Sequence, residues 1–229
     1  MIDILRFNKK ENEYYFMKKL KSFIIIFSFI FSFIGIYFAI IYEFRFWFTI
    51  FIIPAYVFFA SVNNLLNNKT TLRASKKDFL KIYITFFIFG SIIEFIGFFT
   101  FKFWYFPEIS LVGYLFNVLI IGYPMPLLVL TEVFNIFYYL MSRLFKNYIW
   151  KIILSMIFST LIVSLIGETP NNFAHEWVYQ NLPFTNIMIF GTDLLIIVGW
   201  ILLAFLSVFG LACFRFKKIT WLKLELNEN

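Results

Sequence analysis

The sequence has few of the side chains that metal sites and disulfides need. Its 229 residues include one cysteine, Cys213, and one histidine, His175. One cysteine cannot form an internal disulfide, and one histidine excludes the multi-histidine zinc sites of most intramembrane zinc hydrolases. The chain also lacks a Walker A loop, a Rossmann glycine fingerprint, a Gly-x-Ser-x-Gly elbow and an Asp-rich diphosphate motif. We therefore expect neither a metal nor a cofactor.

Charged residues are also scarce. They make up 14% of the chain, whereas hydrophobic residues make up 62%. A soluble domain has about 25% charged and about 45–50% apolar residues, and a fold of this size cannot bury the excess. This composition excludes a soluble globular enzyme, a disordered chain and a nucleic-acid-binding module. It indicates an integral membrane protein whose first partner is the lipid bilayer.

Long apolar runs predict an all-α bundle of six membrane-spanning helices in a single domain. A span needs about 20 apolar residues, and such runs cover residues 22–42, 46–62, 79–101, 111–145, 148–167 and 184–214. Pro54 predicts a kink in the second span. Pro124 and Pro126 predict that the fourth is long, tilted or broken. Residues 1–21 form a basic cytoplasmic or interfacial segment, residues 22–214 the bundle, and residues 215–229 a cytoplasmic tail.

The basic residues predict the orientation. With six spans and a cytoplasmic N-terminus, all but two of the 20 lysines and arginines fall on the cytoplasmic side; the exceptions are Arg45 and Lys102. Cytoplasmic loops are enriched in such residues. Splitting residues 111–145 into two helices would move the last two basic groups outside. We therefore expect a multi-pass protein of the cell membrane with both termini inside, and its net charge of +7 reflects topology, not a nucleic-acid partner.

Carboxylates within the spans are the candidate chemical groups. Glu94, Glu132 and Asp193 lie inside apolar runs, and Glu168 ends the fifth. A charge at the bilayer centre costs about 2.5–3.5 kcal/mol on insertion scales. The predicted topology places Glu94, Glu168 and Asp193 at one depth in the outer half, without a basic residue. Desolvation and mutual repulsion favour their neutral forms, which suits general acid catalysis. These three are the candidate catalytic residues, and interhelical hydrogen bonding is the alternative.

Two predicted outer loops share a layout. Trp104 follows Glu94 by ten residues, Trp177 follows Glu168 by nine, and a proline and a helix follow each tryptophan. This spacing indicates a weak internal repeat of helix, carboxylate, aromatic loop and helix, although tryptophan and tyrosine are also ordinary interfacial residues. The candidate binding residues are the aromatic and polar side chains Trp104, Tyr105, Glu132, Asn135, Trp177, Tyr179 and Trp200.

Further spacings predict helix faces. Gly90, Ser91 and Gly97 lie on the face of Glu94, where small residues allow a neighbouring helix to approach. Glu132 and Asn135 are one turn apart, and either a structural hydrogen bond or ligand binding explains them. Seven-residue spacing predicts that Asn186, Asp193 and Trp200 share a face of the last span.

Residues 90–200 resemble a known family. The segments are Glu94-Phe-Ile-Gly97-Phe-Phe-Thr100, Trp104-Tyr105 and Gly122-Tyr-Pro124, then Glu168-Thr-Pro170, Trp177-Val-Tyr179 and Gly199-Trp200. Together they resemble carotenoid-biosynthesis membrane proteins of the carotenoid hydratase type, whose acid–aromatic–proline layout is shared by lycopene cyclase domains. The sequence departs from that pattern at Phe101, where the family has glycine. It departs again at Met125 and Pro126, where the cyclases have an acidic pair.

The resemblance implies a lyase or isomerase that hydrates or cyclises a terminal C=C bond of an isoprenoid without a redox cofactor. A buried carboxylic acid would protonate the alkene, aromatic faces would stabilise the cation, and a second carboxylate would accept a proton. A small transporter or lipid-binding bundle and a structural subunit of a membrane complex are the alternatives. An apolar tunnel ending at Glu94 and Asp193 would favour the enzyme, and a polar path through Glu132 the transporter. A filled bundle with every acid hydrogen-bonded would favour the structural subunit.

Overall fold

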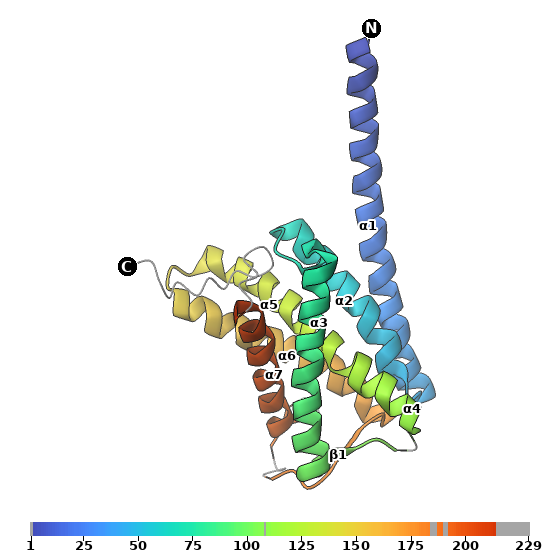
Figure 1. The fold of residues 1–229 in the computed structure, drawn as a ribbon, viewed down its shortest axis with the longest axis vertical. Helices are drawn as coiled ribbons and strands as arrows, with labels where there is room; N and C mark the ends of the chain where they lie inside the picture. The colour runs from blue at the N-terminus through green and yellow to red at the C-terminus, as the bar shows by residue number, and fades with distance from the viewer. Residues whose placement is uncertain (1, 108, 184–186, 190–191, 214–229) are drawn as a thin grey trace.

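The structure is a computed structural model that describes residues 2–107, 109–183, 187–189 and 192–213, with side chains from residue 19 to residue 212. Six of its helices are long and apolar enough to cross a membrane: Lys19–Tyr42, Trp47–Leu66, Lys76–Thr100, Leu111–Leu144, Tyr148–Ala174 and Leu194–Ala212. The predicted all-α bundle is therefore confirmed (Figure 1). The basic tail predicted for residues 215–229 and the position of Asn186 lie outside the described residues.

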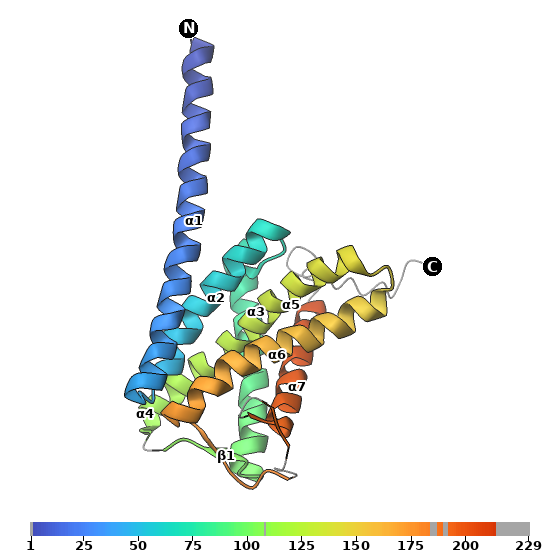
Figure 2. The same ribbon diagram turned by 180° about the vertical axis from the view of Figure 1, so that it is seen from behind.

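The elements follow one another along the chain as α1 (Ile2–Tyr42), α2 (Trp47–Leu66), η1 (Thr71–Arg73), α3 (Lys76–Glu94), η2 (Phe95–Thr100), β1 (Trp104–Tyr105), α4 (Leu111–Gly113), η3 (Tyr114–Gly122), α5 (Pro124–Leu144), α6 (Tyr148–Ala174), β2 (Val178–Tyr179), β3 (Met188–Ile189), β4 (Thr192–Asp193) and α7 (Leu194–Cys213). Helix α1 joins the basic segment and the first span into one continuous helix. Its N-terminal part runs beyond the other helices, as Figures 1 and 2 show.

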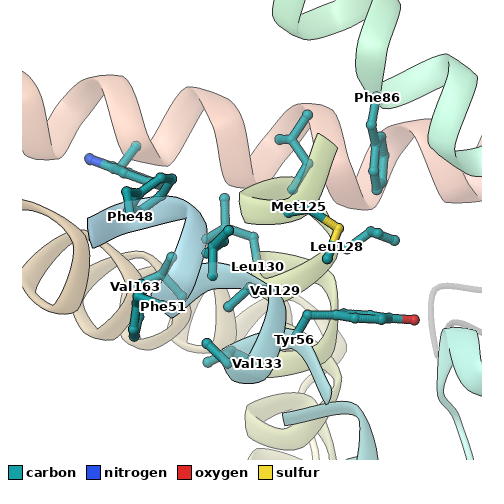
Figure 3. Close-up of a cluster of buried hydrophobic side chains, with 14 of the residues drawn as sticks. Phe48, Phe51, Tyr56, Phe86, Met125, Leu128, Val129, Leu130, Val133 and Val163 are labelled. Carbon is teal, nitrogen blue, oxygen red and sulfur yellow. The ribbon is translucent and has the colours of Figure 1, made fainter. Parts of the chain in front are cut away.

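Helix α5 forms the core of the bundle. It packs against α2, α3, α6 and α7, and every residue from Pro124 to Asn135 is buried. Figure 3 shows its Met125, Leu128 and Val129 among Phe51 of α2 and Phe86 of α3. The outward faces of the other helices carry exposed phenylalanine, isoleucine and leucine side chains, as expected where the surrounding solvent is hydrocarbon.

The fourth span is broken at the predicted place. Helix η3 is π-helical and ends at Gly122, and α5 begins at Pro124. Proline has no N–H to donate and is favoured in the first turn of a helix, so Pro124 starts a new helix more easily than it continues the old one. The break positions Tyr123 between the two helices.

The predicted start of the last span is wrong. Helix α7 begins at Leu194 and not near residue 184, and β3 pairs with β4 in front of it, Met188 opposite Asp193. The Asp193 carboxylate accepts a hydrogen bond of 2.7 Å from the backbone N–H of Leu195. Asp193 therefore caps the helix and does not share a helix face with Trp200. The apolar residues of the β3–β4 hairpin and of α7 look alike in the sequence, so apolar character alone does not show where the helix begins. An aspartate that can cap a helix, such as Asp193, does mark its start.

Candidate functional site

The two aromatic loops pair with each other. Strands β1 and β2 are antiparallel, with Trp104 opposite Tyr179 and Tyr105 opposite Val178. The backbone N–H of Gln180 extends the pairing by donating to the carbonyl of Phe103 at 2.8 Å. We call the end of the bundle that carries this β1–β2 ribbon, below the helices in Figure 1, the aromatic end. Loops separated by more than 70 residues thus meet beside the two predicted glutamates.

Glu94, the last residue of α3, is 1% exposed and accepts hydrogen bonds from three aromatic side chains. The indole N–H of Trp104 donates to its Oε2 at 3.1 Å. The hydroxyl of Tyr114 donates to Oε1 at 2.7 Å, and that of Tyr123 donates to Oε2. The donors come from β1, from η3 and from the break before α5, so this carboxyl group joins three segments.

Two glycines make room for these donors. A Cβ on Gly90 would lie 2.1 Å from Cβ of Tyr123, and a Cβ on Gly97 would lie 1.8 Å from Cη2 of Trp104. Both distances are far below van der Waals contact. The predicted small-residue face therefore holds the side chains of Tyr123 and Trp104 against Glu94, and is not simply a contact between two helix backbones.

Glu168 on α6 occupies a matching cage. It is 2% exposed, and its Oε2 accepts from the indole N–H of Trp177 at 3.2 Å. Its Oε1 accepts from the hydroxyl of Tyr179 at 2.9 Å and from the indole N–H of Trp200 at 2.8 Å. As at Glu94, a tryptophan of the following loop binds the carboxyl group. The predicted repeat of carboxylate and loop tryptophan is present in both halves.

The two cages share a wall. The ring of Trp104, which binds Glu94, contacts the ring of Tyr179, which binds Glu168, edge to face at 6.5 Å between centroids. Burial is the larger cause and the neighbouring Glu168 carboxylate the second cause that raise the pKa of Tyr179 well above its ordinary value of 10. This phenol therefore keeps its proton at physiological pH and remains a hydrogen-bond donor to Glu168.

Glu176 is a further buried acid at the aromatic end, and the sequence did not single it out as a candidate site residue. It is 8% exposed, and its carboxylate accepts a hydrogen bond of 3.1 Å from the backbone N–H of Phe48, in the first turn of α2. Trp47 beside it stacks on Trp177 with centroids 6.2 Å apart. Burial raises the pKa of Glu176 to about 8. The contact ties the start of α2 to the loop that carries Trp177.

Two further residues predicted from the sequence, Glu132 and Asn135, lie away from the two cages. Glu132 is fully buried and accepts from Asn63 at 2.6 Å and from the Thr71 N–H at 2.8 Å, with the hydroxyls of Thr70 and Thr71 also donating. Asn135 donates to the carbonyl of Lys69, at 3.2 Å. Both side chains hold the loop after α2. Asn63 follows Trp47 by 16 residues on α2, or about 24 Å at 1.5 Å per residue, so the structure places Glu132 far from the aromatic end.

The remaining predicted residues do not join the two cages. Asp193 uses its carboxylate to cap α7, and Tyr105 is 40% exposed opposite Val178. The sequence also missed Tyr114 and Tyr123. Residues nine apart point to opposite sides of an α-helix, since each residue turns about 100°. The wider turn of the π-helix η3 brings both phenols to Glu94, and no local signal in the sequence predicts that winding.

Neither of two apolar spaces found among the described helices reaches the predicted acids. An apolar cavity of about 10 Å³ lies between α2, α5, α6 and Trp200, which is the space of about one water molecule. A groove of about 390 Å³ is open to the outside and is lined by Phe29, Phe33 and Tyr37 of α1. Neither space is lined by Glu94 or Asp193, as the expected tunnel would be. Among the described residues, no three His, Cys, Asp or Glu side chains are grouped as a metal site requires.

Comparisons with known proteins leave the chain without a family assignment. Its sequence matches no protein-family model, and neither a curated protein nor a solved structure matches it.

Proposed function

We propose that this integral membrane protein is an enzyme that exchanges protons with a C=C bond of an isoprenoid-type lipid at the aromatic end, with Glu94 as general acid and Glu168 as general base. The observation that carries the proposal is the pair of matching cages. Two buried glutamates, each bound by indole and phenol donors, lie on either side of one shared aromatic wall. Asp193 is assigned a structural role as the cap of α7.

The donor types suit proton transfer. An indole N–H only donates, whereas a phenol hydroxyl donates or accepts. Tyr114 and Tyr123 at Glu94, and Tyr179 at Glu168, can therefore bond to either the ionised or the protonated carboxyl group. Each glutamate can gain or lose a proton while its hydrogen bonds are kept. General acid–base catalysis requires groups that are stable in both states.

The surroundings suit an apolar substrate. The residues Trp104 and Tyr114 are half-buried, and the neighbouring α4 is apolar and exposed, with Leu111 74% exposed. A lipid would therefore reach Glu94 from the bilayer side. Aromatic faces stabilise a cation formed by protonation. The resemblance to carotenoid hydratases and lycopene cyclases supports hydration or cyclisation as the reaction.

A structural subunit of a membrane complex is the second candidate. It is favoured by the hydrogen bonds that Glu94, Glu132 and Glu168 all make. Buried carboxyl groups that only join helices need no proton transfer. Because glutamine keeps the shape and much of the hydrogen bonding of glutamate, the two functions differ in what a glutamine substitution does.

Deuterium incorporation tests the proposal without knowledge of the product. Purified protein in detergent is incubated with a linear polyisoprenoid in D₂O, and the lipid is analysed by mass spectrometry. We expect the wild type to incorporate deuterium, and Glu94→Gln and Glu168→Gln to lose about 10²–10⁴-fold in rate. Glu132→Gln is the matched control, since it changes a buried glutamate at the other end of the bundle. Wild-type protein no more active than heat-denatured protein, or full activity in both cage variants, would contradict the enzyme.

A further inference from the structure

A phenol of α3 reaches the break in the fourth span. The Tyr83 hydroxyl donates a hydrogen bond of 2.5 Å to the backbone carbonyl of Ile120, which lies 37 residues further along the chain, in η3. The ring of Tyr83 packs against Phe79 of the same helix, with centroids 6.3 Å apart. The contact joins the third span to the fourth just before Pro124, where the fourth span changes helix.

The membrane explains why this carbonyl takes a side-chain donor. The last carbonyls of a helix lack partners within that helix, and Ile120 belongs to the last turn of η3. In α-helical geometry its donor would be the N–H of residue 124, which is a proline and has none. Hydrocarbon offers no water in its place, so a neighbouring helix or side chain must donate. Tyr83 is such a donor.

One face of α3 holds the break at three points. Tyr83, Gly90 and Glu94 are seven and four residues apart, a spacing that places them on one side of an α-helix. Tyr83 binds the carbonyl of Ile120. Gly90 leaves room for the ring of Tyr123, and Glu94 accepts a hydrogen bond from the Tyr123 hydroxyl. The same helix therefore fixes the backbone, the ring and the hydroxyl of the segment that ends η3.

We infer that Tyr83 is a positioning residue for the proposed general acid: it fixes the end of η3 so that the Tyr123 hydroxyl stays bonded to Glu94. The inference rests on the proposed function only in naming Glu94 as the acid. Tyr83 precedes Glu94 by 11 residues, or about 16 Å along α3 at 1.5 Å per residue. It therefore acts on the carboxyl group through the break. Without this donor, the end of η3 shifts, and Tyr123, three residues after Ile120, shifts with it.

Infrared spectroscopy of the purified protein in detergent tests the positioning without substrate. The band of Glu94, protonated or ionised, is the one lost in Glu94→Gln, and its position depends on the hydrogen bonds that the carboxyl group accepts. Tyr123→Phe removes one of these bonds and gives the reference shift. We expect Tyr83→Phe to shift the band in the same direction. Tyr56→Phe is the matched control, since it removes a phenol hydroxyl that bonds to Thr71 instead, and should leave the band in place.

A double-mutant cycle tests whether Tyr83 acts through Tyr123. We expect Tyr83→Phe to cause no further shift in a Tyr123→Phe background, because the bond that Tyr83 maintains is already gone. In a Tyr114→Phe background the shift should remain, since Tyr114 donates to the other oxygen of Glu94, Oε1. An unmoved band in Tyr83→Phe, a further shift in the Tyr123→Phe background, or loss of the shift in the Tyr114→Phe background would overturn the inference.

Pro124→Ala keeps the test decisive if Tyr83→Phe does not fold. Alanine adds a backbone N–H at the break, so the double variant Tyr83→Phe/Pro124→Ala should fold and keep the Glu94 band of Pro124→Ala. Misfolding of the double variant would overturn the inference, because the loss would then not come from the missing donor at the break.

Turnover separates this inference from the proposed function. In the deuterium assay we expect Tyr83→Phe to lower kcat about tenfold, the effect of one weakened hydrogen bond to the acid, with KM unchanged. Normal turnover in Tyr83→Phe beside an active wild type would overturn the positioning role and leave the proposed acid and base in place. An inactive wild type would contradict the proposed enzyme, and the infrared cycle would still decide whether Tyr83 positions Tyr123.

Discussion

Replacing Gly97 by alanine tests whether the glycine face exists to seat Trp104 against Glu94. The added Cβ would lie 1.8 Å from Cη2 of Trp104 and 2.4 Å from Cζ2 and Cζ3. Ordinary contact begins at 3.4 Å, so the indole must move by about 1.6 Å. The hydrogen bond of 3.1 Å from Nε1 to Oε2 of Glu94 is then lost. Overpacking costs about 1–3 kcal/mol, and an unpaired buried polar group costs about 1–3 kcal/mol.

The net destabilisation is about 1–5 kcal/mol, after the gain of about 0.5–1 kcal/mol that alanine brings to a helix. At about 2–4 °C per kcal/mol for a chain of this size, the apparent melting temperature falls by at least about 2 °C. We would measure it in detergent by intrinsic fluorescence. Gly199→Ala is the matched control, since nothing lies within 4 Å of its added Cβ, and we expect its melting temperature to be unchanged or slightly raised.

A double-mutant cycle identifies the cause. Trp104→Phe removes the outer ring atoms that the new Cβ would meet, so Gly97→Ala should cost little in that background. The reasoning is refuted if Gly97→Ala is as stable as Gly199→Ala. It is also refuted if Gly97→Ala costs as much with phenylalanine at position 104 as with tryptophan, because the steric contact with the indole would then not be the cause.

Three further predictions concern other parts of the chain. Burial raises the pKa of Glu176 to about 8, so the folded state binds the Glu176 proton more tightly than the unfolded state does. The contribution of this protonation to stability is full below about pH 4.5. It is lost as pH rises through 8, at up to about 1.4 kcal/mol per pH unit. Thermal unfolding from pH 5 to 9 should therefore show a smaller fall for Glu176→Gln than for the wild type, and equal slopes would contradict this. Glu132→Leu leaves the Thr71 N–H and the other donors of the loop after α2 without their acceptor, and each unpaired donor costs about 1–3 kcal/mol. Trypsin should therefore cut this loop faster in Glu132→Leu than in Glu132→Gln. Equal cleavage rates would contradict the role of Glu132 in anchoring the loop. In a background without Cys213, a cysteine at Gln180 should react with an impermeant reagent from outside intact cells and a cysteine at Ser75 should not, and the reverse result would invert the predicted topology.

The sequence by itself determined the class of fold and part of the site. Spanning helices depend on the apolar character of consecutive residues, which is local, so composition and run length predicted six of them. The tryptophans that bind Glu94 and Glu168 lie ten and nine residues after them, close enough for spacing to indicate the contact. The break at Pro124 followed from the missing N–H of proline.

The tertiary structure decided the rest, because it depends on groups far apart in the sequence or on a winding that the sequence does not announce. Trp200 binds Glu168 across 32 residues, and Asn63 binds Glu132 across 69. The pairing of β1 with β2, which joins the two cages, is a contact between segments of different helical hairpins. The π-helical turn of η3 brings Tyr114 and Tyr123 to one carboxyl group, although α-helical geometry would separate them. Only packing in three dimensions therefore turned two isolated glutamates into one connected site.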